Sequence, residues 1–202
     1  MDNNALFKVG YGLYILTAKD EQKDNGCIIN TATQITQTPL RISIAVNKSN
    51  YTYDMIMSTK EFNLSILTEQ VSFNVFKQFG FSSGRDTDKF DGYEIDERTH
   101  NGIRYLSDHV NCVISAKVLS SYDYGTHTMF VADVTSSNVL SSEPSVTYQY
   151  YFDHIKPKPK PPTENKKGFV CKICGYVYEG DSLPEDFICP LCKHGVSDFE
   201  SI

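Results

Sequence analysis

Cysteine is scarce through most of this 202-residue chain, and long apolar runs are absent. Residues 1–155 contain only Cys27 and Cys112, which cannot form a disulfide framework. The apolar runs have the length of strands, and the N-terminal stretch MDNNALFKVG lacks a basic segment followed by a long apolar one. These absences predict a soluble cytoplasmic protein with no membrane segment.

Basic side chains are fewer than acidic ones, with 19 Lys and Arg against 25 Asp and Glu. The excess of acid holds in residues 1–155, with 12 basic against 18 acidic side chains, and in residues 168–202, with 2 against 6. Only residues 156–167 reverse it, with 5 against 1. A nucleic-acid binder places positive charge on a folded face, so no nucleic-acid role is expected. Neither G-x-G-x-x-G nor a P-loop is present.

The stretch IKPKPKPPTENKKG, which begins at Ile155, divides the chain. Alternating Pro and Lys remove backbone donors and leave nothing to bury, so this stretch cannot be a core element. Polyproline geometry and like-charge repulsion favour a semi-stiff spacer. We therefore expect a main domain at 1–154, a linker at 155–167 and a small domain at 168–202.

The main domain is expected to be mainly β. Short, β-branched and often alternating runs predict strands at 11–18, 26–32, 40–46, 62–68, 110–120 and 128–140. Helical spacing occurs at 50–61 and 69–80, the second ending at Gly80 as a C-cap. The polar residues 82–101 predict a long loop. Together these elements predict a mostly antiparallel barrel with two or three helices.

Four cysteines close to the C-terminus form two Cys-x-x-Cys pairs, and this is the strongest signal in the chain. Each pair turns two thiolates toward one point, and two such pairs make a tetrahedral metal site. A domain of this size buries too little apolar surface to fold unaided, so the metal is expected to contribute to folding. Zinc and iron both suit four thiolates. The ligands are Cys171, Cys174, Cys189 and Cys192.

The sequence around these cysteines resembles a rubredoxin. The matching features are CKICGY at 171–176, LPEDF at 183–187, CPLC at 189–192 and DFE at 198–200. Phe187 stands where many rubredoxins have Trp. The resemblance implies one Fe(Cys)4 centre that carries one electron. An aromatic core beside the metal is expected from Tyr176, Tyr178, Phe187 and Phe199.

Two polar stretches in the main domain each follow an apolar strand, NGCIINTATQITQTP at 25–39 and NKSNYT at 47–52. Their hydroxyls, amides and backbone donors, with Lys48 and the start of a helix near Asn50, could cradle a phosphate. Thr and Asn also serve turns and strand edges. Composition leaves both interpretations open.

Residues from about Phe7 to Tyr151 resemble the flavin reductase-like FMN-binding split barrels. The resemblance is carried by the two polar stretches, EFNLSIL, GRDTDKF at 84–90 and GTHTMFVADV at 125–134. The fused arrangement is similar to the high-molecular-weight rubredoxins of anaerobes. It implies electron transfer from NAD(P)H through FMN to the iron and on to a redox protein of the flavodiiron class, and it implies a homodimer.

The resemblance also assigns residues to the flavin. Those expected at the isoalloxazine and ribityl chain are Cys27, Ile28, Ile29, Asn30, Thr31, Gln34 and Thr36. Those expected at the phosphate are Asn47, Lys48, Asn50 and Thr52. Lys89 and His127 lie in motifs near flavin or nicotinamide, and Tyr148, with Tyr150 and Tyr151, is expected to close the site. No nucleophile–base pair is expected, because the cofactors carry the chemistry.

Other interpretations of the same residues remain. The metal could be a structural zinc ribbon on a flavin-binding barrel, and the acceptor could be a soluble ferric chelate or free flavin. Cys27 could be a small buried residue, and Cys112, in the apolar run VNCVISA, is expected in the core.

Overall fold

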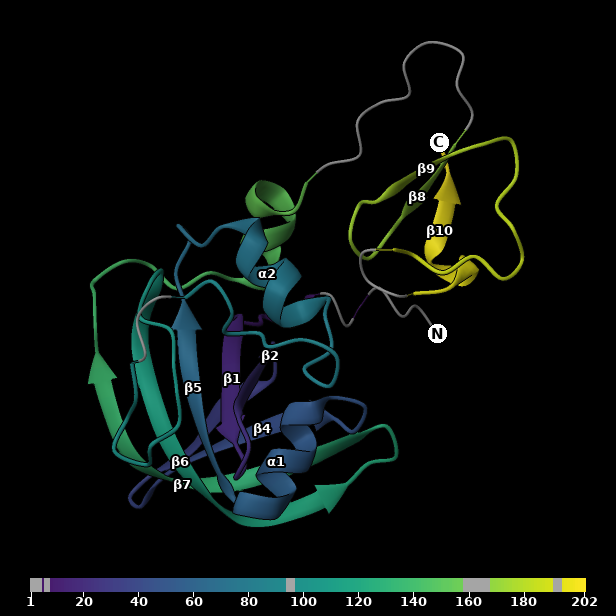
Figure 1. Cartoon of the computed structure of the whole chain (residues 1–202). Coiled ribbons are helices and arrows are strands. Elements are labelled where there is room, and N and C mark those ends of the chain that lie inside the picture. The colour runs from purple at the N-terminus through teal and green to yellow at the C-terminus, as the bar shows by residue number, and fades with distance from the viewer. Residues whose placement is uncertain (1–4, 6–7, 94–96, 158–167, 191–193) are drawn as a thin grey trace.

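The computed structural model describes residues 5, 8–93, 97–157, 168–190 and 194–202. A large curved sheet with helices at its two ends forms the main domain, and a small three-stranded sheet forms the C-terminal domain (Figure 1). The strands of the large sheet are β1 (Tyr14–Lys19), β2 (Asp24–Ile29), β3 (Ala32–Gln37), β4 (Leu40–Asn47), β5 (Glu61–Leu67), β6 (Val110–Asp123) and β7 (His127–Val139). The mainly β fold predicted from the sequence is confirmed.

The large sheet has the order β2-β1-β5-β6-β7-β4-β3, and every pairing in it is antiparallel. Its two edge strands, β2 and β3, are consecutive in the chain and are joined by Asn30 and Thr31 alone. Three Cα steps span about 11 Å at most, so the two edges must approach each other there. The sheet therefore curls into a barrel that is split between β2 and β3.

The barrel interior is filled by apolar side chains from alternate strand positions. Leu16, Ile44, Phe62 and Phe130 are almost fully buried and pack in one cluster with Ile56 of helix α1 (Tyr51–Thr59). Burying a side chain of this size is worth about 1.5–3 kcal/mol, so this cluster dominates the stability of the barrel.

A second apolar cluster lies under helix α2 (Phe73–Gly80), which approaches the C-terminal domain (Figure 1). Phe76 and Phe79 of this helix are buried against Leu67 and Tyr151. Tyr151 begins a π-helical turn (Tyr151–Ile155) that follows the short helix α3 (Tyr148–Tyr150). This cluster fixes the aromatic end of the barrel beside the small domain.

Several predicted elements need correction. The run predicted as one strand at 26–32 ends at Ile29, and β3 follows as a separate strand. Gly80 is the last residue of α2 and is not a left-handed cap, because Phe81 caps the helix in a right-handed conformation. The left-handed cap belongs to α1, at Lys60 with φ 61°. Cys112 is half-buried rather than part of the core.

The C-terminal domain has the strand order β10-β8-β9, with antiparallel pairing. Its elements are β8 (Gly168–Cys171), β9 (Val177–Glu179), a 3-10 turn (Val196–Asp198) and β10 (Phe199–Ser201). No helix in the part of the chain that the structure describes is long and apolar enough to cross a membrane.

Candidate functional site

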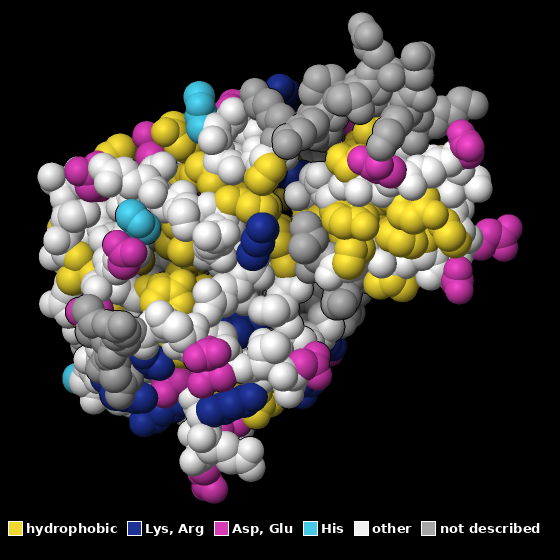
Figure 2. All heavy atoms as spheres, turned by 45° about the horizontal axis from the view of Figure 1, so that its top comes forward, with side chains coloured by type: hydrophobic (Ala, Val, Ile, Leu, Met, Phe, Trp, Pro, Cys, Tyr) yellow, Lys and Arg dark blue, Asp and Glu magenta, His cyan; other side chains and the backbone are white. Residues whose placement is uncertain are grey.

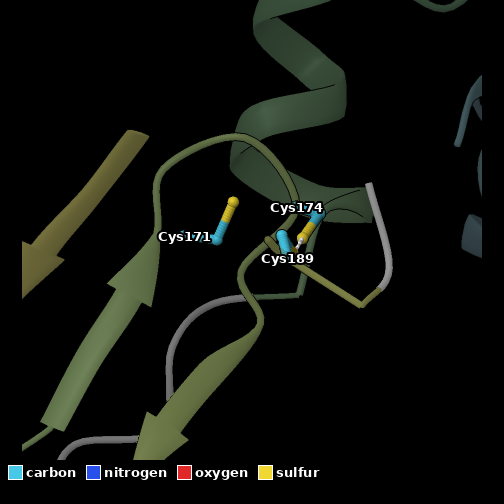
Figure 3. A group of neighbouring side chains, drawn as sticks. All are labelled: Cys171, Cys174 and Cys189. Carbon is cyan, nitrogen blue, oxygen red and sulfur yellow. Dashed lines mark hydrogen bonds between the residues drawn. The ribbon is translucent and has the colours of Figure 1, made fainter. Parts of the chain in front are cut away.

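Three buried thiols converge in the C-terminal domain. The Sγ atoms of Cys171, Cys174 and Cys189 all lie within 4.8 Å of one another, and each residue is at most 2% exposed (Figure 3). Sulfurs at about 2.3 Å from a tetrahedral ion stand about 3.8 Å apart, so this cluster fits a metal. The fourth predicted ligand, Cys192, lies outside the described residues.

Tight turns present these thiols. The Gly175 amide donates a 2.8 Å hydrogen bond to the Cys171 carbonyl, and Gly175 has a φ of 78° that favours glycine. In the second pair the Cys189 amide donates a 2.8 Å bond to the carbonyl of His194. These two hydrogen bonds hold Cys171 and Cys189 in place through the backbone of the domain itself.

The predicted aromatic core beside the cluster is confirmed. The ring of Phe187 lies 4.8 Å from Tyr178, 5.4 Å from Phe199 and 6.4 Å from Tyr176, measured between centroids. Tyr176 and Phe199 also pack against the cysteines. These rings shield the sulfurs from water, which keeps a metal held there in a medium of low polarity.

A cleft of about 860 Å³ lies between the barrel and the first cysteine pair. Its barrel wall includes Ile28, Phe81, Tyr148 and Tyr151, and Ile173 closes the opposite side. Burial raises the pKa of the Tyr148 hydroxyl and of the Tyr151 hydroxyl, so both are neutral and act as aromatic walls. Figure 2 shows apolar side chains gathered along this junction and over the small domain.

A second cavity, of about 280 Å³, opens at the split between β2 and β3. Asn30 and Thr31 line it, opposite Ala45 and Met129. The Thr31 hydroxyl donates a 2.7 Å hydrogen bond to the Ala45 carbonyl, which fixes the link between the edge strands. The segment Val9–Tyr11 lines both hollows, so they are neighbours on the barrel surface.

Predicted phosphate residues surround the N-terminus of α1. Asn50 is the N-cap residue, and its side chain makes no capping hydrogen bond. Lys48 pairs with Asp123, whose pKa is held below its usual value chiefly by that hydrogen bond. Asn47 accepts from the Ser49 amide at 2.9 Å. Thr52 is fully buried and accepts a 2.9 Å bond from the Asn25 amide, so it supports the helix from within.

Other predicted flavin residues do not line either hollow. Cys27 and Ile29 are buried in the barrel core, and burial raises the pKa of the Cys27 thiol. Gln34 and Thr36 are exposed on β3. His127 is exposed at the start of β7, where it pairs with Asn47 in the strand ladder.

Lys89 is buried behind β2 at 4% exposure. Its ammonium group donates 2.9 Å hydrogen bonds to the carbonyls of Gly26 and Phe79, and burial lowers its pKa. These bonds tie the loop after α2 to the strand that carries Ile28, so Lys89 supports the wall of the cleft from outside it.

Sequence reasoning missed residues on both sides of the cleft. Phe81 and Ile173 line it, and no local pattern marks either one. Arg85 stacks over the Tyr51 ring at 5.0 Å and pairs with Asp54, close to the start of α1. Its position in GRDTDKF, a motif of the resemblance, was the available signal.

The family comparison decides what this barrel is. The model of the flavin reductase like domain matches residues 6–158. The chain belongs to the flavin reductase-like family. A second model, the rubredoxin-like domain of rubrerythrin, matches residues 169–200, which hold the sulfur cluster. The chain therefore joins a flavin reductase-like barrel to a rubredoxin-like domain, and it is an oxidoreductase.

Two curated relatives support this description of the flavin reductase-like chain. It is 36% identical over 233 aligned positions to the high molecular weight rubredoxin of Moorella thermoacetica, with all of both chains covered. It is 35% identical to a ferric-chelate reductase (NAD(P)H) of Archaeoglobus fulgidus, covering 80% of this chain and 94% of that one.

A solved structure shows the same fold as the flavin reductase-like barrel. The FMN-binding protein from Thermus thermophilus superposes with a TM-score of 0.62 at 17% identity, over 70% of this chain and 83% of the other. The fold, the family matches and the buried thiol cluster together support a flavin and an iron as the cofactors of this family member.

Proposed function

We propose that this protein passes electrons from NAD(P)H through FMN to a mononuclear Fe(Cys)4 centre, and from there to a protein acceptor such as a flavodiiron oxygen or nitric oxide reductase. One observation carries the proposal: the wall of the 860 Å³ cleft is shared by the barrel and by Lys172 and Ile173, which stand between the first two cysteines. A flavin in this cleft would lie beside the metal ligands.

When bound, a flavin takes two electrons as a hydride and releases them singly, and iron accepts one at a time. The chain supplies placement for this chemistry. Ile28 and the Tyr148 ring form apolar surfaces of the cleft, which suits a planar ring system. Asn30 and Thr31 present amide and hydroxyl groups where the two barrel edges meet, which suits the ribityl chain.

The FMN phosphate is proposed to bind at the N-terminus of α1. Helix amides there point outward, and the helix dipole favours an anion. The Asn50 side chain leaves these amides without a cap, while Lys48 is exposed enough to exchange Asp123 for a phosphate. Arg85, across the Tyr51 ring, adds positive charge on the other side.

The thiol cluster is proposed to hold iron that changes valence without changing ligands. Cys171, Cys174 and Cys189 are buried within the ring cluster around Phe187, so water does not compete for the metal. Cys192 would complete the set. The Gly175 and Cys189 amides hold the described part of the cluster through backbone hydrogen bonds, and a fixed site needs little rearrangement on electron transfer.

The acceptor is proposed to dock on the exposed side of the rubredoxin-like domain. Ile188, next to Cys189, is 53% exposed. Glu179, Asp181, Glu185 and Asp186 are exposed on the same domain, in which residues 168–202 carry 2 basic and 6 acidic side chains. An apolar spot with acidic surroundings fits a partner with a basic rim.

A homodimer is also proposed. Leu119 and Tyr122 of β6 are each 50% exposed, and Val139 at the end of β7 is 82% exposed. Leu119 and Tyr122 lie near the β6–β7 turn, whereas Val139 pairs with Cys112 at the opposite end of the ladder, so the two exposed side chains near the turn offer an apolar contact for a second copy. Light scattering coupled to size exclusion tests this, and a monomer at micromolar concentration would contradict it.

An anaerobic titration with NADH, combined with metal analysis, tests the proposed function. We expect iron in the purified protein, bleaching of the flavin band, and bleaching of the ferric band in the same experiment. Protein that contains zinc and no iron would contradict the electron relay and favour the structural zinc ribbon.

A soluble ferric chelate is the second candidate acceptor, because the Archaeoglobus fulgidus relative is named for that activity. The two candidates differ in their dependence on the metal domain. Reduction of a ferric chelate directly from the barrel would persist after iron is removed, whereas transfer through the rubredoxin-like domain would stop.

A further inference from the structure

Two side chains touch both the sulfur cluster and the cleft. Phe81 belongs to the barrel, and Ile173 lies between Cys171 and Cys174 in the first cysteine turn. Each packs against the buried cysteines, and each lines the 860 Å³ cleft. The wall between the metal ligands and the proposed flavin site therefore consists of an aromatic ring from one domain and an aliphatic chain from the other.

Phe81 is held firmly on the barrel side of this wall. It caps α2, and its amide donates a 3.1 Å hydrogen bond to the Lys77 carbonyl. Its ring lies 6.0 Å from that of Phe73 at an interplanar angle of 58°. The backbone and a neighbouring ring thus fix where Phe81 meets the small domain.

The same cysteine turn makes a polar contact at the edge of the wall. The Lys156 ammonium group donates a hydrogen bond to the carbonyl of Lys172. Tyr151, buried at 6% exposure, lines the cleft next to these groups, and its carbonyl accepts a 2.7 Å hydrogen bond from the Lys156 amide. Phe81 therefore stands in a contact between domains that is apolar at its centre and polar at its rim.

We propose that Phe81 is a positioning residue for electron transfer between the two domains. Its ring seats the first cysteine turn against the cleft, and transfer occurs while this contact is made. The inference rests on the proposed function. One hydride carries two electrons, which reduce the ferric ion to ferrous in two successive transfers, with reoxidation by the acceptor between them and one proton released to water.

Removing the ring should reduce the fraction of time that the domains are in contact. A tenfold lower population corresponds to a loss of about 1.4 kcal/mol of contact free energy. Hydride transfer from NADH takes place at the barrel wall of the cleft and needs no contact with the metal domain. The two steps should therefore respond differently to the same substitution.

Anaerobic stopped-flow of the full-length holoprotein separates the steps, because flavin and ferric absorbance bleach independently. For Phe81→Ala we expect iron reduction to slow about tenfold more than flavin reduction by NADH does, so the ratio of the two rates is the readout. Phe81→Leu keeps an apolar side chain and should recover most of the rate. Tyr124→Ala removes a 67% exposed ring in the β6–β7 turn and should change neither step.

A second measurement reports on the contact without catalysis. Small-angle scattering of the protein without NADH should give a larger radius of gyration for Phe81→Ala than for wild type or Tyr124→Ala. The iron content and the ferric spectrum should match wild type, because Phe81 is not a ligand. A merely structural role in the barrel would change the melting temperature without this selective effect.

The outcomes are distinguishable. Equal iron reduction rates in wild type and Phe81→Ala would overturn the inference, and so would an equal slowing of flavin and iron reduction. A wild-type protein whose flavin is reduced but whose iron never follows would instead refute the proposed function.

Discussion

The ammonium nitrogen of Lys89 lies 2.9 Å from the carbonyl oxygen of Gly26, in the packed interior behind β2. A second carbonyl, that of Phe79, accepts from the same nitrogen. A charge buried in this way binds the loop after α2 to the strand that forms the cleft, so it links barrel stability to the geometry of the proposed flavin site.

Replacing Lys89 by Met should destabilise the barrel by about 1–3 kcal/mol, because two buried carbonyls lose their donor. Urea unfolding at pH 7 measures the change. Lys117→Met, at an exposed position of β6, is the matched control and should be close to neutral. Equal stability of the two variants would show that the Lys89 bonds contribute nothing net.

The stability contribution of Lys89 should also depend on pH. Burial lowers its pKa below the ordinary 10.5, so between the two values the unfolded chain holds a proton that the folded chain has released. This pH-dependent part of the Lys89 contribution to the free energy of unfolding is complete above pH 10.5 and is lost as pH falls through the folded pKa, whereas the part from its hydrogen bonds to the two carbonyls remains at pH 7. The difference between wild type and Lys89→Met, followed by urea unfolding from pH 7 to 10.5, should rise with pH.

Replacing Cys189 by Ser should abolish metal binding and unfold the rubredoxin-like domain. Cys189 is fully buried, and its sulfur lies 3.4 Å from that of Cys174, so no other described side chain can take its place. Metal analysis should show a fall from about one ion per chain to a trace. Cys112→Ser changes a half-buried thiol of the barrel and should keep the metal. Loss of the metal in this variant would contradict the assignment of the ligands.

Replacing Lys48 by Met should weaken FMN binding about tenfold, since a charge-assisted hydrogen bond is worth about 1.5–3 kcal/mol. Fluorescence titration measures the dissociation constant. Riboflavin, which lacks the phosphate, is the internal control and should bind both proteins alike. An equal loss of affinity for FMN and riboflavin would show that Lys48 does not contact the phosphate.

Electron transfer to a protein acceptor should slow as salt increases, because the acidic residues of the rubredoxin-like domain are exposed. The double variant Glu185→Gln and Asp186→Asn should start slower and show a weaker salt dependence in stopped-flow. Glu21→Gln, on the barrel surface, should behave like wild type. If the wild-type rate of electron transfer to the acceptor does not change with salt concentration, electrostatic docking is contradicted.

Local patterns predicted much of this fold. The alternation in β4 and the apolar run of β5 predicted which of their side chains are buried. The predicted bounds of both strands differ from the observed ones by one residue. β3 was missed as a separate strand because almost all of its side chains are exposed, so burial leaves no periodic signal. Its pairing with β4 alone makes it a strand.

The clustering of Cys171, Cys174 and Cys189 was predictable for the same reason, since the cysteine spacing alone points to a shared site. The other functional contacts depend on distant residues. Lys89 bonds to a carbonyl 63 positions away, and Phe81 meets the cysteine turn across two domains. Sequence spacing cannot show such meetings, because only the folded chain brings these groups together.

The ring cluster around Phe187 consists of phenyl and phenol groups, and the chain has no tryptophan. The ultraviolet emission of this protein therefore comes from its tyrosines, and no indole emission overlaps it. A single Phe187→Trp substitution would place one fluorophore in direct contact with the metal domain's core, giving an optical reporter of that domain alone.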